Sequence, residues 1–239
     1  MCGRYVLEGP VSRVQNFFDA DLTEAFDDYA NGCYNIAPTM QIPVVRINRK
    51  GERVLIRHRW GLIPSWAKDA TIGAKLNNAR GETVHEKPSF RKGFKHFRCL
   101  IPASGYYEWQ APPQGSKERK QPFYISARDG LQLPIAGIWS SWRSPNGEVI
   151  ETASIITQEA RGELETIHSR MPVFMPPDRW DLWLNPRNTD VNELKSLMVV
   201  EQPESIVIAR PVSDAVNSVA NNGKELTVET PLGEPETLF

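Results

Sequence analysis

Short runs in which hydrophobic and polar residues alternate dominate the pattern of this chain, and such runs are typical of β-strands. Two of them, Ile42–Ile47 and Val54–Arg59, flank Asn48-Arg49-Lys50-Gly51 and predict a hairpin. Asp129-Gly130 and Asn146-Gly147 mark further tight turns. The remaining predicted strands are Cys99–Pro102, Tyr106–Gln110, Pro122–Ala127, Pro134–Ser140 and Val149–Thr157.

Helical periodicity is weaker along the chain and predicts short helices. Pro177 suits a first helical turn, and Asp190 is a suitable N-cap. The predicted helices are Val11–Asp19, Ala79–His85, Gln158–Ile167, Pro177–Leu184 and Val191–Met198. Many short strands with helices scattered among them favour an α+β fold, built as a single domain on an antiparallel or mixed barrel-like sheet with peripheral helices. A doubly wound fold would need regular strand–helix alternation and usually a glycine-rich loop, and the chain has neither.

The length of 239 residues allows one large domain or two small ones, and 40% hydrophobic with 24% charged residues is ordinary for a soluble protein. No apolar run approaches the ~18 residues of a membrane span, and no secretory signal is evident. Ala111–Lys117 is expected to be a solvated loop. The cysteines Cys2, Cys33 and Cys99 are odd in number and far apart, which argues against a disulfide framework or a zinc site. We therefore expect a cytoplasmic protein without a metal or cofactor.

The formal net charge of −1 provides no general attraction to nucleic acid. Many DNA-binding domains are clearly basic, so this charge counts mildly against a DNA partner. A local cluster of arginines can still act within a Debye length of ~10 Å. Composition alone leaves the function open.

Cys2 is the first candidate for chemistry. Initiator methionine is normally removed when the next residue is small, and removal here would leave an α-amine and a thiol on adjacent carbons. Such an aminothiol can condense with an aldehyde to an imine and then close a thiazolidine ring. The unperturbed pKa values, ~8 for the amine and ~8.5 for the thiol, keep a fraction of both groups reactive near neutral pH. A chance Met-Cys start without any function is the alternative.

Three other segments contain polar residues in settings that suit catalysis. Asn78 and Arg80 lie at a predicted helix start, where Asn78 either caps the helix or orients a nearby amine, and Arg80 suits a phosphate. Glu108 lies in an aromatic strand, on the same face as Tyr106, and is either exposed or a buried carboxyl with a raised pKa. His168 precedes Arg170 in a proline-containing loop, where functional groups concentrate.

Two tryptophans, Trp60 and Trp66, flank a Pro/Gly-containing loop. They either pack in the core or form a platform on which bases stack. Asn35 and Pro38 belong to a further turn, rigid enough to shape a groove.

Together these segments resemble the SRAP (SOS-response-associated peptidase) family. The matching motifs, in the family's order, are Cys2-Gly3-Arg4-Tyr5, Tyr34-Asn35-Ile36-Ala37-Pro38, Trp60-Gly61-Leu62-Ile63-Pro64, Asn78-Ala79-Arg80-Gly81-Glu82-Thr83, Gly105-Tyr106-Tyr107-Glu108-Trp109 and His168-Ser169-Arg170-Met171-Pro172. The resemblance implies an SRAP-like domain over residues 1–230, followed by a tail at 231–239. It also implies a monomer that senses abasic sites in single-stranded DNA and crosslinks itself to them.

The resemblance further implies a role for each candidate residue. Cys2 would form the Schiff base and then the thiazolidine, Glu108 would transfer protons, His168 would stabilise or protonate the sugar oxygen, and Asn78 would hold Cys2. Weak lyase activity would accompany the Schiff base. The implied DNA-binding residues are Arg4, Arg80 and Arg170 at phosphates, Trp60 and Trp66 near displaced bases, and Asn35 and Pro38 in the groove. Two rival classes remain: a peptidase or N-terminal-nucleophile hydrolase, which attacks through the Cys2 thiol, and a nucleic-acid-binding module without catalysis.

Overall fold

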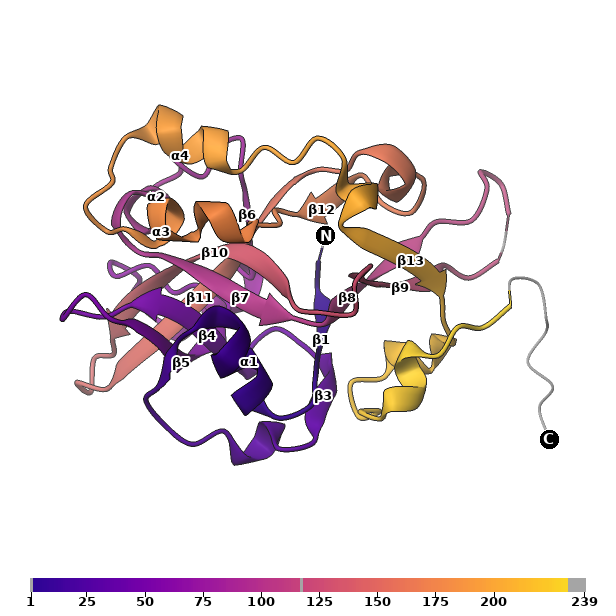
Figure 1. The fold of residues 1–239 in the computed structure, drawn as a ribbon, viewed down its shortest axis with the longest axis horizontal. Helices are drawn as coiled ribbons and strands as arrows, with labels where there is room; N and C mark the ends of the chain where they lie inside the picture. The colour runs from indigo at the N-terminus through magenta and orange to yellow at the C-terminus, as the bar shows by residue number, and fades with distance from the viewer. Residues whose placement is uncertain (1, 117, 232–239) are drawn as a thin grey trace.

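The structure, a computed structural model, describes residues 2–116 and 118–231. Two β-sheets form its body and short helices lie around them (Figure 1). The predicted α+β class with a barrel-like sheet and peripheral helices is confirmed. Lys117 of the predicted loop and residues 232–239 of the expected tail lie outside the described residues. Within the described part of the chain, no helix is long and apolar enough to cross a membrane.

The larger sheet contains a closed barrel. Strands β11, β10, β7, β4 and β5 are neighbours in that order, and β5 also pairs in parallel with β11, with Trp60 opposite Ala153. This last pairing closes the ring, and buried residues from all five strands belong to the main hydrophobic core. The strands of this sheet are β2 (Asp21–Leu22), β4 (Gln41–Ile47), β5 (Arg53–Trp60), β6 (Asn78–Arg80), β7 (Arg98–Ala103), β10 (Leu133–Arg143), β11 (Val149–Glu159) and β12 (Arg170–Pro172).

The smaller sheet is antiparallel throughout and holds the start of the chain. Its order is β13-β9-β8-β1-β3, so that β1 lies between β8 and β3, with Tyr5 opposite both Tyr106 and Ile36. The backbone N–H of Ser104 donates to the carbonyl oxygen of Val6 at 2.7 Å and ties the end of β7 to β1. The strands are β1 (Arg4–Glu8), β3 (Gly32–Ile36), β8 (Gly105–Gln110), β9 (Gln121–Ala127) and β13 (Val207–Pro211).

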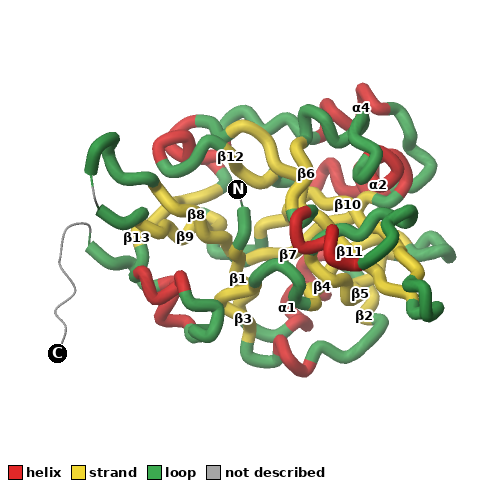
Figure 2. Tube along the Cα trace, turned by 180° about the vertical axis from the view of Figure 1, so that it is seen from behind, coloured by secondary structure: helices red, strands yellow, loops and turns green. Residues whose placement is uncertain are grey.

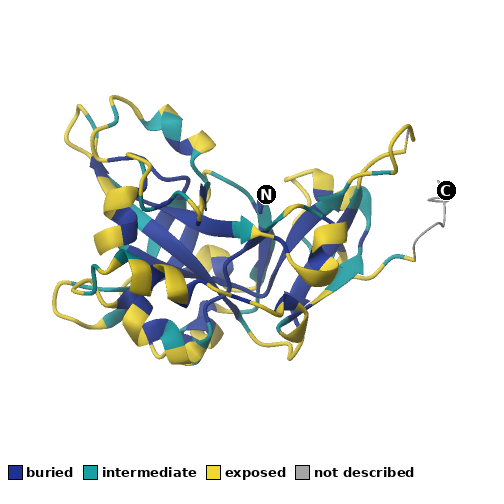
Figure 3. Ribbon diagram, turned by 90° about the horizontal axis from the view of Figure 1, so that it is seen from above, coloured by how far each residue is buried: buried dark blue, intermediate teal, exposed yellow. Residues whose placement is uncertain are grey.

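The N-terminal segment therefore reaches the seam between the two sheets. Figure 2 shows β1 entering this region, with β8 and β9 on one side and the barrel on the other. In the view from above, the chain start lies between two groups of buried strands (Figure 3). A residue placed here can receive side chains from both sheets.

The helices are α1 (Val11–Phe18), α2 (Arg91–His96), α3 (Trp180–Leu184) and α4 (Val191–Leu197). The predicted helices at the positions of α1, α3 and α4 are confirmed. Pro177 begins the short 3-10 turn before α3, and the Asp190 carboxylate accepts from the backbone N–H groups of Asn192 and Glu193 as an N-cap. Figure 3 shows the exposed faces of these helices turned away from the buried strands.

Two predicted helices are wrong. Residues 79–85 form the end of strand β6 and then turns, because Asn78–Arg80 pairs in parallel with Ile155–Thr157 of β11. Tertiary pairing here overrides a local helix-start pattern. Residues 158–167 continue β11 as far as Glu159, and only Gly162–Thr166 forms a 3-10 turn.

Candidate functional site

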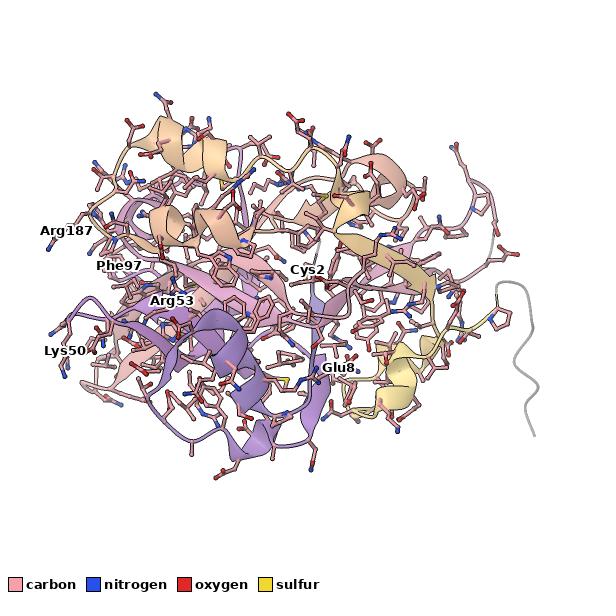
Figure 4. The ribbon with its side chains drawn as sticks, viewed as in Figure 1. Cys2, Glu8, Lys50, Arg53, Phe97 and Arg187 are labelled. Atoms are coloured by element: carbon pink, nitrogen blue, oxygen red, sulfur yellow. The ribbon has the colours of Figure 1, made fainter. Side chains whose placement is uncertain are left out.

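Cys2 lies two residues before the start of β1 and is fully buried. Figure 4 shows it in the middle of the molecule, at the seam between the sheets. Burial raises the pKa of the Cys2 thiol, and the negative charge of Glu108 raises it further. The thiol is therefore protonated at neutral pH. A nucleophilic role would require a neighbouring group to accept its proton.

Glu108 is such a neighbour. It is only 3% exposed, on the face of β8 that also carries Tyr106, while Tyr107 and Trp109 pack on the other face. The predicted alternation along this strand and the buried form of the carboxyl are confirmed. Desolvation raises the pKa of Glu108, and the charge of His168 is among the effects that oppose the rise. The carboxyl group can therefore exchange a proton closer to neutral pH than an exposed glutamate can.

Asn78 connects the barrel to Cys2. Its side-chain Nδ2 donates a hydrogen bond of 2.7 Å to the backbone carbonyl oxygen of Cys2. The Oδ1 atom of the same amide is buried and has no hydrogen-bond partner among the described residues. Because Asn78 lies in strand β6, the helix-cap interpretation is wrong. The amide holds Cys2 by one end and leaves an acceptor at the other.

His168 is oriented by its own turn. Its Nδ1 accepts the backbone N–H of Arg170 at 2.9 Å, so the neutral ring carries its proton on Nε2. The carbonyl oxygen of Arg170 also lies 3.3 Å from Nδ1. This contact is not a hydrogen bond in the tautomer described, because an Nδ1 that accepts an N–H has no proton to donate. The Nε2–H of the neutral ring is thus a donor. His168 is also among the groups that lower the pKa of Glu108, so the two residues lie within electrostatic range of each other.

Arg170 makes its strongest contacts inside the protein. Its two terminal nitrogens donate to the Glu82 carboxylate at 2.7 and 2.9 Å, and one of them also donates to the Thr157 carbonyl at 2.7 Å. Sequence reasoning assigned no role to Glu82. No spacing rule could have found it, because 88 positions separate it from Arg170. The pair fixes the turn that carries His168.

Arg4 and Asn35 also turn inward. Nη1 of Arg4 donates to Asn35 Oδ1 at 2.8 Å and to the Val216 carbonyl at 2.9 Å. Asn35 is 2% exposed, and its Nδ2 donates to the carbonyls of Val216, Ser218 and Asn221. The expected direct contact between Asn35 and DNA does not fit this burial. Both side chains anchor the C-terminal segment to the smaller sheet.

The two tryptophans of the Pro/Gly-containing loop differ in their exposure to solvent. Trp60 is fully buried and packs edge-on against Tyr5, with 5.3 Å between the ring centres. Its Nε1 donates a hydrogen bond of 2.9 Å to the carbonyl oxygen of Asn77. Its expected role beside displaced bases is therefore wrong, and the core interpretation holds. Trp66 is 60% exposed, at the rim of a cavity that neither Cys2 nor Glu108 lines. Pro38 is half-buried in the turn before β4.

Arg80 is the predicted phosphate ligand that remains available. It is exposed at the end of β6, and its guanidinium has no ion-pair or hydrogen-bond partner in the described part of the chain. Strand alternation places it on the same side of β6 as Asn78. Arg80 therefore lies on the side of β6 whose Asn78 contacts Cys2. Within residues 2–116 and 118–231, no cluster of three or more His, Cys, Asp or Glu side chains could hold a metal ion.

Comparison with known proteins agrees with this arrangement. The family model described as "SOS response associated peptidase (SRAP)" matches residues 1–219. The chain is 39% identical to the abasic site processing protein YoqW of Bacillus subtilis, over 95% of this chain and 98% of the relative. It is 33% identical to the abasic site processing protein HMCES of Gallus gallus, over 85% of this chain and 68% of the relative.

A crystal structure of a protein from Bacteroides thetaiotaomicron has the same fold, with a TM-score of 0.83 and 26% identity, covering 96% of this chain and all of the other. This chain of 239 residues therefore belongs to the SRAP family.

Proposed function

We propose that this protein recognises abasic sites in single-stranded DNA and becomes covalently attached to them through Cys2, once Met1 has been removed. Met1 lies outside the described residues. The observation that carries the proposal is the hydrogen bond from Asn78 to the backbone of Cys2, in a site that also contains a buried acid and a histidine. The relatives named as abasic site processing proteins support the choice of substrate.

The chemistry joins an aldehyde to an aminothiol. A ring-opened abasic sugar has an aldehyde at C1′. The α-amine of Cys2 adds to this carbon, and loss of one water gives a protonated imine. The Cys2 sulfur then bonds to the same carbon as the thiol gives up its proton, and the electrons of the C=N bond return to nitrogen. The product is a thiazolidine, and the net loss is one water.

Glu108 can serve both proton transfers. In its acid form it protonates the departing hydroxyl group, and as a carboxylate it then receives the thiol proton. The raised pKa of Glu108, which follows from desolvation, favours the acid form at the start. The raised pKa of the Cys2 thiol makes an acceptor necessary. Glu108 therefore acts first as an acid and then as a base, and it is protonated again when the thiazolidine has formed.

His168 and Asn78 provide orientation. The Nε2–H that the Arg170 backbone imposes on His168 can donate to the sugar oxygen as the ring opens. The unpartnered Oδ1 of Asn78 can accept from the released α-amine and direct its lone pair toward the sugar. Arg80, exposed beside Asn78, binds a flanking phosphate. Slow β-elimination from the imine would appear as weak lyase activity.

The rival function is hydrolysis, in which the Cys2 thiol attacks a carbonyl and the α-amine acts as base. Substitution separates the two. An N-terminal serine can still attack a carbonyl, whereas thiazolidine closure requires sulfur. Cys2→Ser should therefore abolish the stable DNA adduct, while a hydrolase would keep measurable activity.

The proposal is tested with two oligonucleotides that differ only at the lesion. One contains an abasic site, and the other contains a tetrahydrofuran analogue, which has the same shape without an aldehyde. The protein should form a band that resists denaturation with the first strand only. Equal yields with both strands, or an equal yield with Cys2→Ala, would contradict the proposal.

A further inference from the structure

The molecule contains a cavity of about 760 Å³ that is separate from Cys2. It is lined by the β4–β5 hairpin, the loop after β5, helix α2 with the residues before it, and part of β10. In Figure 4 the labelled Lys50 and Phe97, which line it, lie toward one end of the molecule, whereas Cys2 lies in the middle. The volume is within the range of small-molecule sites. None of Cys2, Asn78, Glu108 and His168 lines it.

The charges around this cavity are strongly one-sided. Among the described residues, Glu151 is the one acidic residue that lines the cavity, and it is paired with Arg46 at 2.9 Å. Arg98 is buried and donates to five backbone carbonyls, so its guanidinium is committed to the fold. The basic lining residues are Arg46, Arg49, Lys50, Lys92, His96 and Arg98.

Three of these cations remain available. Arg49, Lys50 and Lys92 are exposed and have no acidic partner in the described part of the chain. Arg49 and Lys50 come from the β4–β5 hairpin, and Lys92 comes from α2. The chain as a whole has a net charge of −1, so this local excess of positive charge is not a property of the average surface. It favours an anionic ligand.

Aromatic groups lie among these charges. Trp139 is half-buried, with the Arg46 guanidinium 4.2 Å from the centre of its ring and Phe97 edge-on at 4.9 Å. The Lys92 ammonium lies 5.7 Å from the Phe97 ring. Trp66, 60% exposed, stands at the rim. Planar surfaces of this kind stack nucleobases, and the adjacent cations suit phosphate.

We infer that this cavity binds a nucleotide, with the base against the aromatic side chains and the phosphate against Lys50 and Lys92. The ligand is either a free nucleotide or one nucleotide of a single strand, since both offer a planar base joined to a phosphate. The site does not depend on the aldehyde chemistry at Cys2. Its binding should therefore survive Cys2→Ala.

The test measures binding of dAMP, of deoxyadenosine and of a short oligodeoxyadenylate without an abasic site, by calorimetry at low salt. Wild-type protein and Cys2→Ala should bind dAMP or the oligonucleotide saturably, and deoxyadenosine more weakly. The double variant Lys50→Ala/Lys92→Ala should weaken binding by about 10-fold, because two charge-assisted contacts are lost. Lys195→Ala/Lys224→Ala removes two exposed lysines that do not line the cavity, and should bind as wild type does.

The two sources of the nucleotide give different results. Saturable binding of dAMP that the Lys50/Lys92 change weakens indicates a free nucleotide. Loss of oligonucleotide affinity alone, without dAMP binding, indicates a nucleotide within a strand. The inference is overturned if neither probe binds saturably, or if Lys50→Ala/Lys92→Ala binds both probes as tightly as the lysine control.

Discussion

The side-chain amide of Asn78 donates a 2.7 Å hydrogen bond to the backbone carbonyl oxygen of Cys2, across 76 positions of the sequence. The contact joins the barrel, through β6, to the segment that leads into β1 of the smaller sheet. It holds the main chain of Cys2 rather than its sulfur. In the proposed mechanism, the orientation of the α-amine after Met1 removal depends on Asn78, which takes no part in bond formation.

Asn78→Ala should slow crosslinking more than it weakens DNA binding. The variant loses the bond to the Cys2 carbonyl, and misplacement of a reacting group by about 1 Å can cost on the order of 10²-fold in rate. Asn78→Asp keeps an acceptor for the amine but loses the Nδ2 donor, so it should be partly active. The measurement is single-turnover crosslinking, with binding of the tetrahydrofuran strand as the control. An unchanged rate in Asn78→Ala would show that this contact is only structural.

Glu108→Gln should slow crosslink formation by about 10²-fold if Glu108 transfers the protons. Wild-type activity should decline as pH rises through the raised pKa of Glu108, because the acid form is then lost. Glutamine has no such titration, so the variant should lack this decline. His168→Ala should affect sugar opening more than the final yield. Rates measured from pH 5.5 to 8.5 would settle both roles, and a Glu108→Gln rate equal to wild type throughout would remove the acid from the mechanism.

The stability of the protein should respond to the same carboxyl group. In the unfolded chain Glu108 ionises near its ordinary pKa of ~4.3, whereas desolvation keeps it protonated to higher pH in the fold. The folded state then binds more protons, so its stability falls as pH rises from the unfolded to the folded pKa. Glu108→Gln should lose this dependence. Thermal unfolding of both proteins against pH should show curves that diverge as pH rises, and parallel curves would contradict the burial argument.

Salt dependence should distinguish the three arginines. Arg80 is exposed and unpaired among the described residues, so Arg80→Ala should reduce the salt slope of DNA binding by about 0.7. Arg4 and Arg170 already donate to partners inside the protein, and their alanine variants should change the slope less. Lys195→Ala provides an exposed control on α4. Equal slopes for wild type and Arg80→Ala would show that Arg80 does not contact phosphate.

Local patterns predicted the strands well, because alternation and turn residues depend on near neighbours in the sequence. The hairpin of β4 and β5 and the two faces of β8 are examples. The helix expected at residues 79–85 failed, because pairing of β6 with β11 involves residues far away in the chain. No local signal carries that information.

The same distinction between local and long-range information applies to the candidate site. Residue type and setting selected Cys2, Asn78, Glu108 and His168, and the structure places these residues at the seam of the two sheets. The sequence could not show which of the two tryptophans flanking one loop is buried. In the structure Trp60 lies in the core, whereas Trp66 is exposed. The ion pair between Glu82 and Arg170 likewise depends on the fold.

The intact mass of the protein after incubation with an abasic single strand tests the central claim most directly. The free protein should have the mass of the chain from Cys2 onward. The adduct should equal the sum of protein and DNA minus one water, and should survive heating without borohydride. Cys2→Ser should give no such heat-stable species. An active protein that retains Met1, or a stable adduct of normal yield with Cys2→Ser, would contradict the account.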